Sequence, residues 1–233
     1  MTAGSRWGTD PYPDYAAQVN ASISFSGQRV DFFAKRKSLW LRKTIAKCFS
    51  GATSLACLDI GCGIGLLHQY LEGSVHSLTG VDVSSEAIVN AVSRNPHNTY
   101  VVYDGHSLPF ADASFDICLT VCVLHHLRPT FWRDFIAEMG RVTRPRGAAV
   151  VIEHNPFNPL TRYAVSRCAF DDDATLVRPK TIRRLFAQAD FLEARVHHFF
   201  HVPFDACWAE EVDNLLAFVP FGVQYAVVAR KNI

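Results

Sequence analysis

The sequence predicts an α/β fold in which a mostly parallel sheet carries helices on both faces. Between residues 55 and 152, short apolar runs alternate with segments of helical periodicity, a pattern typical of parallel strands joined by crossover helices. Two further apolar runs follow, at residues 193–202 and 223–230. With 233 residues, 49% of them hydrophobic, the chain is long enough for one well-packed domain with a small lid and too short for two full domains.

The elements follow in a regular order. We expect strands at residues 55–60, 77–81, 100–103, 115–121, 147–152, 193–202 and 223–230, with helices from Ile64 and at 84–93, 129–143 and 179–189. Arg144–Gly147 is predicted to be a compact stop, because Pro145 ends a helix and Gly147 frees a turn. Residues 55–233 would form the domain, with long inserts at 154–178 and 203–222 covering the substrate.

The first 54 residues are predicted to be an arm and a lid helix. Residues 1–27 are rich in Gly, Pro, Ser, Asp and Tyr, whereas Gln28–Phe49 has apolar residues near helical spacing. The same helix has a basic side, which we interpret as a solvated surface, with an anionic substrate or RNA as the alternative. Its members are Lys35, Arg36, Lys37, Arg42, Lys43 and Lys47.

Composition limits the partners and the compartment. The net charge of +1 provides no global field for DNA, RNA or an anionic membrane. No apolar run reaches bilayer length and no leader is evident, so we expect a cytoplasmic protein, either a monomer or a homodimer. The seven cysteines are odd in number and include no C-x-x-C pair, which favours reduced thiols.

Residues 55–65, Leu-Ala-Cys-Leu-Asp-Ile-Gly-Cys-Gly-Ile-Gly, are the most informative segment. Gly61, Gly63 and Gly65 allow positive φ and let backbone N–H groups approach a ligand, and the strand-to-helix turn is expected to aim a positive helix N-terminus at it. A fixed carboxylate at Asp59 would repel the pyrophosphate of a dinucleotide. The segment therefore predicts a loop for a nucleotide cofactor that is cationic.

Two more acids follow apolar runs. Asp82 ends the second run, where its carboxylate can accept both hydroxyls of a ribose, although it could also cap the next helix. Asp104 directly follows Tyr100–Tyr103, within reach of an adenine amino group, although Asp104-Gly105 is also a common turn dipeptide. Three predicted strands thus end in acids.

Together these residues resemble the class I S-adenosylmethionine-dependent methyltransferases, in the small-molecule branch that includes the quinone-type enzymes. The resemblance covers roughly residues 55–152 and implies S-adenosylmethionine as cofactor. It also implies a seven-stranded Rossmann-like sheet in three layers, with the last strand antiparallel. In that family the loop holds the methionine end, the second acid the ribose and the third the adenine. Carried over, the cofactor site comprises Asp59, Gly61, Cys62, Gly63, Gly65, Asp82, Val83, Asp104, Gly105, His106 and Val121.

Three histidines are candidates for a general base. Methyl transfer from a sulfonium is an in-line displacement, so the protein mainly aligns two reactants in a dry site, and a base is needed only if the nucleophile carries a proton. His125 and His126 follow the fourth strand, and His154 follows the fifth beside Glu153. Alternatively, His126 lines the cofactor and His125 packs into a helix start. His154 is slightly favoured because it begins an insert.

Other histidines and one short motif point away from rival chemistries. His197, His198 and His201 lie on a late strand whose neighbours face opposite sides, so we expect a structural role and no metal. Asn155-Pro156-Phe157 is similar to the loop of enzymes that methylate amino groups in nucleic acids or proteins, but that loop follows strand four, not strand five.

The resulting hypothesis is a methyltransferase acting on a small-molecule acceptor, whether a secondary metabolite, quinone-like or glycan-type. Two alternatives remain open: an RNA methyltransferase that uses the basic helix, and a non-catalytic binding subunit with the same fold. A nucleotide-dependent oxidoreductase is least favoured because of Asp59.

Overall fold

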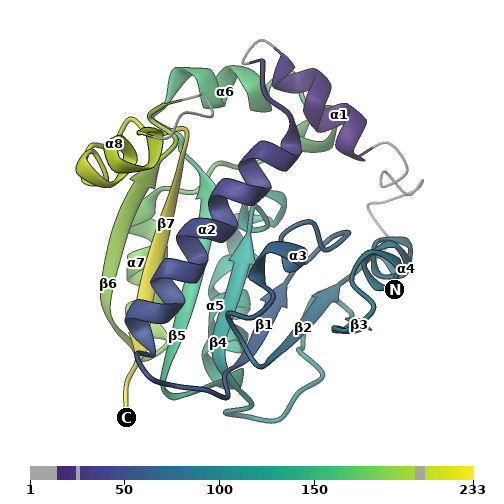
Figure 1. The fold of residues 1–233 in the computed structure, drawn as a ribbon, viewed down its shortest axis with the longest axis vertical. Helices are drawn as coiled ribbons and strands as arrows, with labels where there is room; N and C mark the ends of the chain where they lie inside the picture. The colour runs from purple at the N-terminus through teal and green to yellow at the C-terminus, as the bar shows by residue number, and fades with distance from the viewer. Residues whose placement is uncertain (1–14, 25–26, 203–207) are drawn as a thin grey trace.

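The computed structural model describes residues 15–24, 27–202 and 208–233. Most of the expected N-terminal arm and the first part of the second insert lie outside these residues. The described chain forms one seven-stranded sheet in the order β3-β2-β1-β4-β5-β7-β6 (Figure 1). The strands are β1 (Ala56–Ile60), β2 (Ser77–Asp82), β3 (Thr99–Val102), β4 (Phe115–Val121), β5 (Thr143–His154), β6 (Phe191–Phe199) and β7 (Gln224–Lys231).

The predicted sheet topology is confirmed. Strands β1 to β5 pair in parallel, and β7 is antiparallel to both β5 and β6. The order reverses between β1 and β4, because the chain runs outward from β1 to β3 and then returns to β1's other side. In open α/β sheets ligands bind at such a switch point, beyond the carboxyl ends of the strands.

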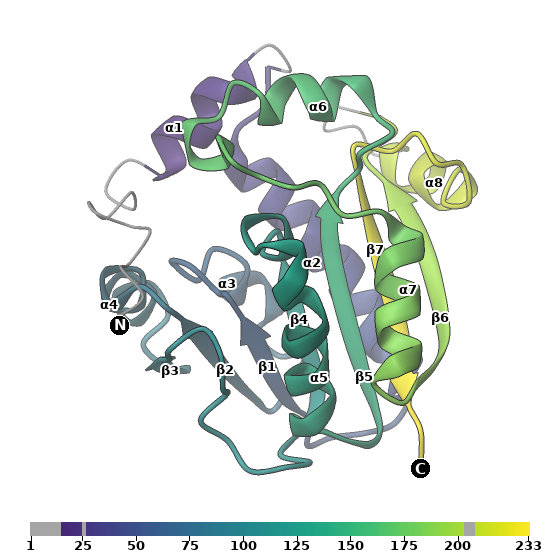
Figure 2. The ribbon, with the colours of Figure 1, turned by 180° about the vertical axis from the view of Figure 1, so that it is seen from behind.

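Helices cover both faces of the sheet. The long helix α2 (Val30–Cys48) lies across one face, and α5 (Trp132–Val142) and α7 (Pro179–Gln188) cover the other (Figures 1 and 2). Each face has its own core, one including Leu41 and Ile45 of α2, the other Ile136 and Phe186. Helices α3 (His68–Leu71) and α4 (Ser85–Arg94) complete the βα units. No described helix combines the length and apolar content needed to cross a membrane.

The prediction of a turn between helix and strand at Arg144–Gly147 is wrong. Helix α5 does end nearby, at Val142, but β5 begins at once with Thr143. The pairing with β4 shifts between Phe115↔Thr143 and Ile117↔Ala148, so the intervening residues form an irregularity inside the strand. Arg146, and not Gly147, takes the positive φ, at 62°. Sequence favoured a turn because the bulge uses the same Pro and Gly residues that turns use.

Short helices that the sequence analysis did not predict lie in the inserts and before α2. They are α1 (Tyr15–Ser22), α6 (Pro159–Val165), the 3₁₀ turn η5 (Ala169–Asp171) and α8 (Ala209–Leu215). In both ribbon views α1 and α6 lie beyond the carboxyl ends of β4 and β5 (Figure 2). Buried amides join the two inserts: Asn155 donates to the carbonyls of Pro220 and Gly222 at 3.0 and 2.7 Å, and Asn158 donates to that of Phe221 at 2.6 Å.

The basic side of α2 is partly used inside the protein. Arg36 pairs with Asp213 of α8, and Lys43 pairs with Glu210 of the same helix. Lys37 Nζ lies 3.9 Å from the Cys122 sulfur, at the tip of β4. The expected solvated surface is therefore, in part, the contact between the helix and the second insert.

Replacing Leu58 by alanine is expected to destabilise the fold by about 2–5 kcal/mol, because large-to-small changes in a packed core lose buried area and leave a cavity. Leu58 of β1 is 0% exposed. Urea denaturation measures the loss. Val89→Ala on α4, where the side chain is 68% exposed, is the matched control and should change stability by less than about 0.5 kcal/mol. Equal losses in the two variants would contradict this placement of the core.

Candidate active site

The predicted carboxylates gather at one edge of the sheet. Asp59 is the penultimate residue of β1 and Asp82 the last of β2, and Asp104 follows β3 by two residues. Because β1, β2 and β3 are parallel, their carboxyl ends lie side by side. The three acids therefore lie along this edge in the same order as in the sequence.

The glycine loop after β1 adopts the expected backbone but uses its amides differently. Gly61, Gly63 and Gly65 have φ of 77°, 52° and 66°. The N–H groups of Gly61 and Cys62 donate to the carbonyl of Val81 at 2.8 and 3.0 Å, and Gly63 donates to Asp82 Oδ2 at 2.8 Å. These amides therefore shape the loop, contrary to the expectation that they face a ligand. Helix α3 spans four residues, so the expected helix dipole at this loop is small.

Gly61 and Gly65 allow neighbouring side chains to approach the loop backbone closely. A Cβ at Gly61 would lie 2.5 Å from Val123 Cγ2, and one at Gly65 would lie 2.8 Å from Asn95 Nδ2. No side chain fits at either position without displacement. The loop is thus packed against Val123, which follows β4, and Asn95, at the end of α4.

Asp59 belongs to a buried chain of three polar side chains. His68 Nε2 lies 2.9 Å from Asp59 Oδ2, and His68 Nδ1 lies 2.7 Å from the Tyr100 hydroxyl. The other oxygen of Asp59, Oδ1, is buried and has no hydrogen-bond partner among the described residues. Sequence analysis missed His68 and Tyr100, because no periodicity links them to Asp59.

Asp82 is held by two backbone amides. Its Oδ2 accepts from Gly63, and its Oδ1 accepts from Ser84 N at 3.0 Å. Burial raises the pKa of Asp82, although these two hydrogen bonds oppose the rise. The alternative role as helix cap is wrong, since Ser84 is the N-cap of α4 and accepts from Ala87 N. The neighbouring Val83 is exposed.

Asp104 and Gly105 form a turn, which was the alternative interpretation of this dipeptide. Its Oδ1 accepts from His106 and Ser107 N–H groups at 2.8 and 2.9 Å, and these bonds lower the pKa of Asp104. Gly105 has a φ of 80°. A small hollow beside the turn is lined by Ile60, Tyr103, Gly105, His106 and Leu108 among others, and Val121 ends β4 half-buried. An adenine contact at Asp104 stays a prediction.

The three candidate bases come together at the tips of β4 and β5. His125 Nδ1 lies 2.6 Å from Glu153 Oε2, and His125 Nε2 lies 3.4 Å from Asp171 Oδ1. His126 Nε2 lies 3.6 Å from the same oxygen of Asp171. The rings of His125 and His154 are 4.9 Å apart. Asp171 stood out in the sequence only as part of an acidic run in the first insert.

Their surroundings distinguish these histidines. Burial alone would lower the pKa of His125, but the charge of Glu153 and hydrogen bonds to Asp171 and Glu153 raise it well above the ordinary value. Burial and then the charge of His125 lower the pKa of His126 to about 3. Although burial opposes it, the hydrogen bond from His125 and the nearby histidines lower the pKa of Asp171 to about 2. The pKa values of the two neighbouring histidines are thus shifted in opposite directions.

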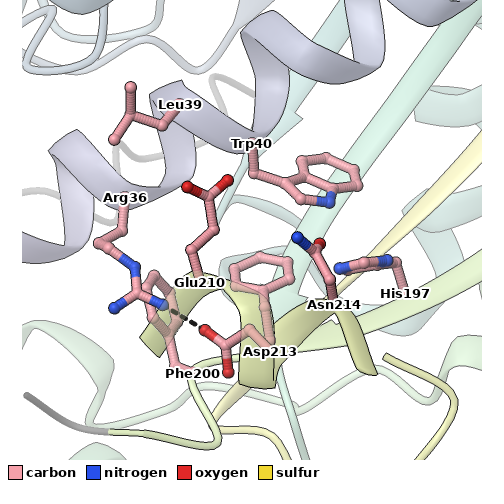
Figure 3. A pocket seen from close by; sticks show the side chains of 9 residues that line it. Arg36, Leu39, Trp40, His197, Phe200, Glu210, Asp213 and Asn214 are labelled. Atoms are coloured by element: carbon pink, nitrogen blue, oxygen red, sulfur yellow. Dashed lines mark hydrogen bonds and ion pairs between the residues drawn. The ribbon is translucent and has the colours of Figure 1, made fainter. Parts of the chain in front are cut away.

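The later histidine group lies elsewhere. His198 Nδ1 is 3.2 Å from the Ala217 carbonyl, and His201 Nδ1 is 3.3 Å from Asp213. His197 lines a small hollow between α2, β6 and α8 with Trp40 and Asp213 (Figure 3). None of the predicted cofactor residues lines this hollow. These contacts are consistent with the expected structural role.

The fold and the carboxylate edge define the class: this is the Rossmann-like fold of the class I S-adenosylmethionine-dependent methyltransferases. Residues 58–151, less than half of the chain, match the model of the methyltransferase domain family. A methyltransferase from Archaeoglobus fulgidus, described as S-adenosylmethionine-dependent, has a similar structure. Its TM-score is 0.65 at 19% identity, covering 85% of this chain and 94% of that one.

Two curated relatives are similar over less than half of the chain. An uncharacterized methyltransferase of Synechocystis is 34% identical over 104 residues, which is 44% of this chain and 49% of the relative. A phthiotriol/phenolphthiotriol dimycocerosates methyltransferase of Mycobacterium ulcerans is 36% identical over 110 residues, 46% of this chain and 40% of the relative. The chain thus spans about half or less of the length of these relatives.

The packing around the loop after β1 generates a stability prediction. Gly61→Ala is expected to cost more than Gly73→Ala, its matched control in the turn after α3. Both glycines have positive φ, 77° and 73°, so both variants lose roughly 1–2 kcal/mol from backbone strain. A Cβ at Gly73 meets nothing within 4 Å, whereas one at Gly61 overlaps Val123 and adds about 1–3 kcal/mol. Urea denaturation compares them, and equal losses would show that the loop is not tightly packed.

Proposed function

We propose that this protein transfers a methyl group from S-adenosylmethionine to a small-molecule acceptor, such as a secondary metabolite, a quinone-like compound or a glycan-type compound. The observation that carries the proposal is the row of carboxylates at the switch point, with one buried oxygen of Asp59 unpartnered in the described structure. Such an oxygen fits a cationic ligand.

The donor site would be built from residues at the ends of β1, β2 and β3. When bound, S-adenosylmethionine supplies a methyl group already activated by a positive sulfur. Asp59 Oδ1 would accept from the amino group of the methionine end. Asp82, held in place by the Gly63 and Ser84 amides, would accept from the ribose hydroxyls. Asp104 and the hollow beside Gly105 would take the adenine end.

The acceptor site would lie at the tips of β4 and β5, under α6 and η5. Here the protein excludes water and aligns the acceptor, an effect that can reach roughly 7–11 kcal/mol in intramolecular models. Of the three candidate histidines, His125 is held between Glu153 and Asp171, and His126 is packed edge-on against Phe170, with ring centroids 4.8 Å apart. His154, at the end of β5 and half-buried, is the one we assign to the acceptor.

A small acceptor is favoured over RNA by the contacts of α2. Arg36 and Lys43 pair with acids of α8, and Lys37 lies against Cys122, so much of the basic side is already occupied. A non-catalytic subunit with this fold would bind the donor but release no methylated product.

Calorimetry with S-adenosylmethionine and with its demethylated product tests the donor site. We expect the wild-type protein to bind both, and Asp82→Ala to bind each more weakly by about 1–3 kcal/mol, because the ribose loses hydrogen bonds to a charged acceptor. Glu193→Ala, at an exposed position of β6, should bind like the wild type. Absence of binding at tens of micromolar would count against the whole proposal, and unchanged affinity in Asp82→Ala would count against the ribose assignment.

His154→Ala tests the acceptor site. For an acceptor that must lose a proton, we expect turnover to fall by about 10²–10⁴-fold, with donor affinity unchanged. The assay follows isotope-labelled methyl from the donor into a metabolite extract. His201→Ala, which removes a histidine bonded to Asp213 outside this site, is the control. Methylation at the wild-type rate in His154→Ala would contradict the assignment.

A further inference from the structure

We propose that His125, His154 and Asp171 bind one divalent transition-metal ion at the acceptor end of the site. The three residues come from the turn after β4, the end of β5 and the 3₁₀ turn η5. One ligand atom from each lies within 4.8 Å of the other two, and no other such group of His, Cys, Asp or Glu occurs in the described part of the chain. The site itself needs no assumption about methyl transfer.

The spacing is close to that of a coordination sphere. Ligands bonded at roughly 2.1 Å in tetrahedral geometry lie about 3.4 Å apart. His125 Nε2 and Asp171 Oδ1 are 3.4 Å apart. The ligand atoms of the three residues now lie within 4.8 Å of one another, so the His154 ring would have to move about 1 Å closer to the other two ligands. Its position at the end of a strand, half-buried, permits such an adjustment.

The supporting contacts are those that metal-binding histidines typically have. A ligating imidazole usually donates its second N–H to a carboxylate, which fixes the tautomer. His125 Nδ1 lies 2.6 Å from Glu153, which is fully buried and also accepts from Val123 N and Leu124 N. His125 Nε2 is thereby aimed at Asp171. Glu153 acts through His125 and is a positioning residue.

Gln224 offers similar support to His154. Gln224 Nε2 lies 3.3 Å from His154 Nδ1, while the amide oxygen is buried and without a hydrogen-bond partner in the described structure. The oxygen and nitrogen of an amide are interchangeable by a flip. In the flipped form the oxygen would accept from His154 Nδ1, and the other ring nitrogen would be free for a metal.

Charge also favours a cation here. Glu153 and Asp171 are two carboxylates removed from most solvent, at 1% and 12% side-chain exposure, and they lie on either side of His125. Any proton on His125 Nε2 would leave for solvent as the nitrogen–metal bond forms. Two imidazole nitrogens and one carboxylate oxygen suit Zn²⁺, Fe²⁺, Co²⁺ or Mn²⁺ better than Mg²⁺ or Ca²⁺.

The use of the ion, as distinct from its binding, rests on the proposed function. A bound divalent metal lowers the pKa of a hydroxyl that it coordinates. A metal ion at the tips of β4 and β5 would therefore help the acceptor to lose its proton, which is otherwise the role of a general base. His154 would then act as a ligand, and not as a proton acceptor.

The test is zinc titration of chelator-treated full-length protein, by calorimetry and by competition with a chromophoric chelator. We expect one Zn²⁺ per chain, with affinity reduced by about a hundredfold or more in His154→Ala and Asp171→Asn and about 10–100-fold in Glu153→Gln. His201→Ala removes a histidine–aspartate contact of the same kind and should bind Zn²⁺ like the wild type. In the Co²⁺ form, ligand-field absorption without a thiolate charge-transfer band is expected, which separates this site from binding at Cys122.

Two results would overturn the inference: no stoichiometric Zn²⁺ binding, or binding that persists unchanged in both His154→Ala and Asp171→Asn. His125 would then simply bridge two carboxylates by hydrogen bonds. The proposed function has its own readout, since donor binding does not involve these residues. If chelated protein methylates at the full rate while donor binding is intact, the metal has no part in turnover and the methyltransferase proposal still holds.

Discussion

Burial of carboxylates at a single edge of the sheet is the constraint on which the whole site depends. Asp59, Asp82 and Glu153 are each at most 4% exposed. An ionised carboxylate removed from water must find hydrogen bonds or an opposite charge, or it becomes strongly destabilising. The loops after β1 and β4 supply backbone amides to Asp82 and Glu153, respectively. The shape of these loops is therefore a consequence of the acids that they enclose, and the glycines make that shape sterically possible.

The same constraint divides the edge into two chemically different ends. At β1 the carboxylate of Asp59 has one buried oxygen, Oδ1, without a hydrogen-bond partner among the described residues. At β4 and β5 the charge of Glu153 is already offset by His125, which also faces Asp171. The donor and the acceptor would thus be held at different ends of one edge of the sheet. In-line transfer needs this separation, because the two reactants must approach from opposite sides of the methyl group.

The strands and the family of the fold were predictable because both depend on short-range patterns. Apolar runs that end in Asp59, Asp82 and Asp104 mark strand ends directly, and the predicted strand 115–121 agrees with β4. Contacts between segments distant in sequence were not predictable. Asp171 meets His125 across an insert whose short helices, α6 and η5, have little periodicity of their own. The hydrogen bonds from the Gly61 and Cys62 amides to the Val81 carbonyl likewise depend on the register of β1 against β2, which composition does not specify.

The basic side of α2 shows how tertiary contacts decide between readings that the sequence leaves open. Lys43 and Glu210 are 64% and 40% exposed, so their ion pair contributes little to stability. Arg36 and Asp213 are 12% and 6% exposed, and Asp213 also accepts from His201 N at 2.7 Å. Removing Arg36 would leave a buried charge without its partner, which is costly. Asp213 therefore joins the lid helix, the end of β6 and α8. Arg36, which the sequence assigned to a solvated surface with RNA or an anionic substrate as the alternative, holds the second insert beside the sheet.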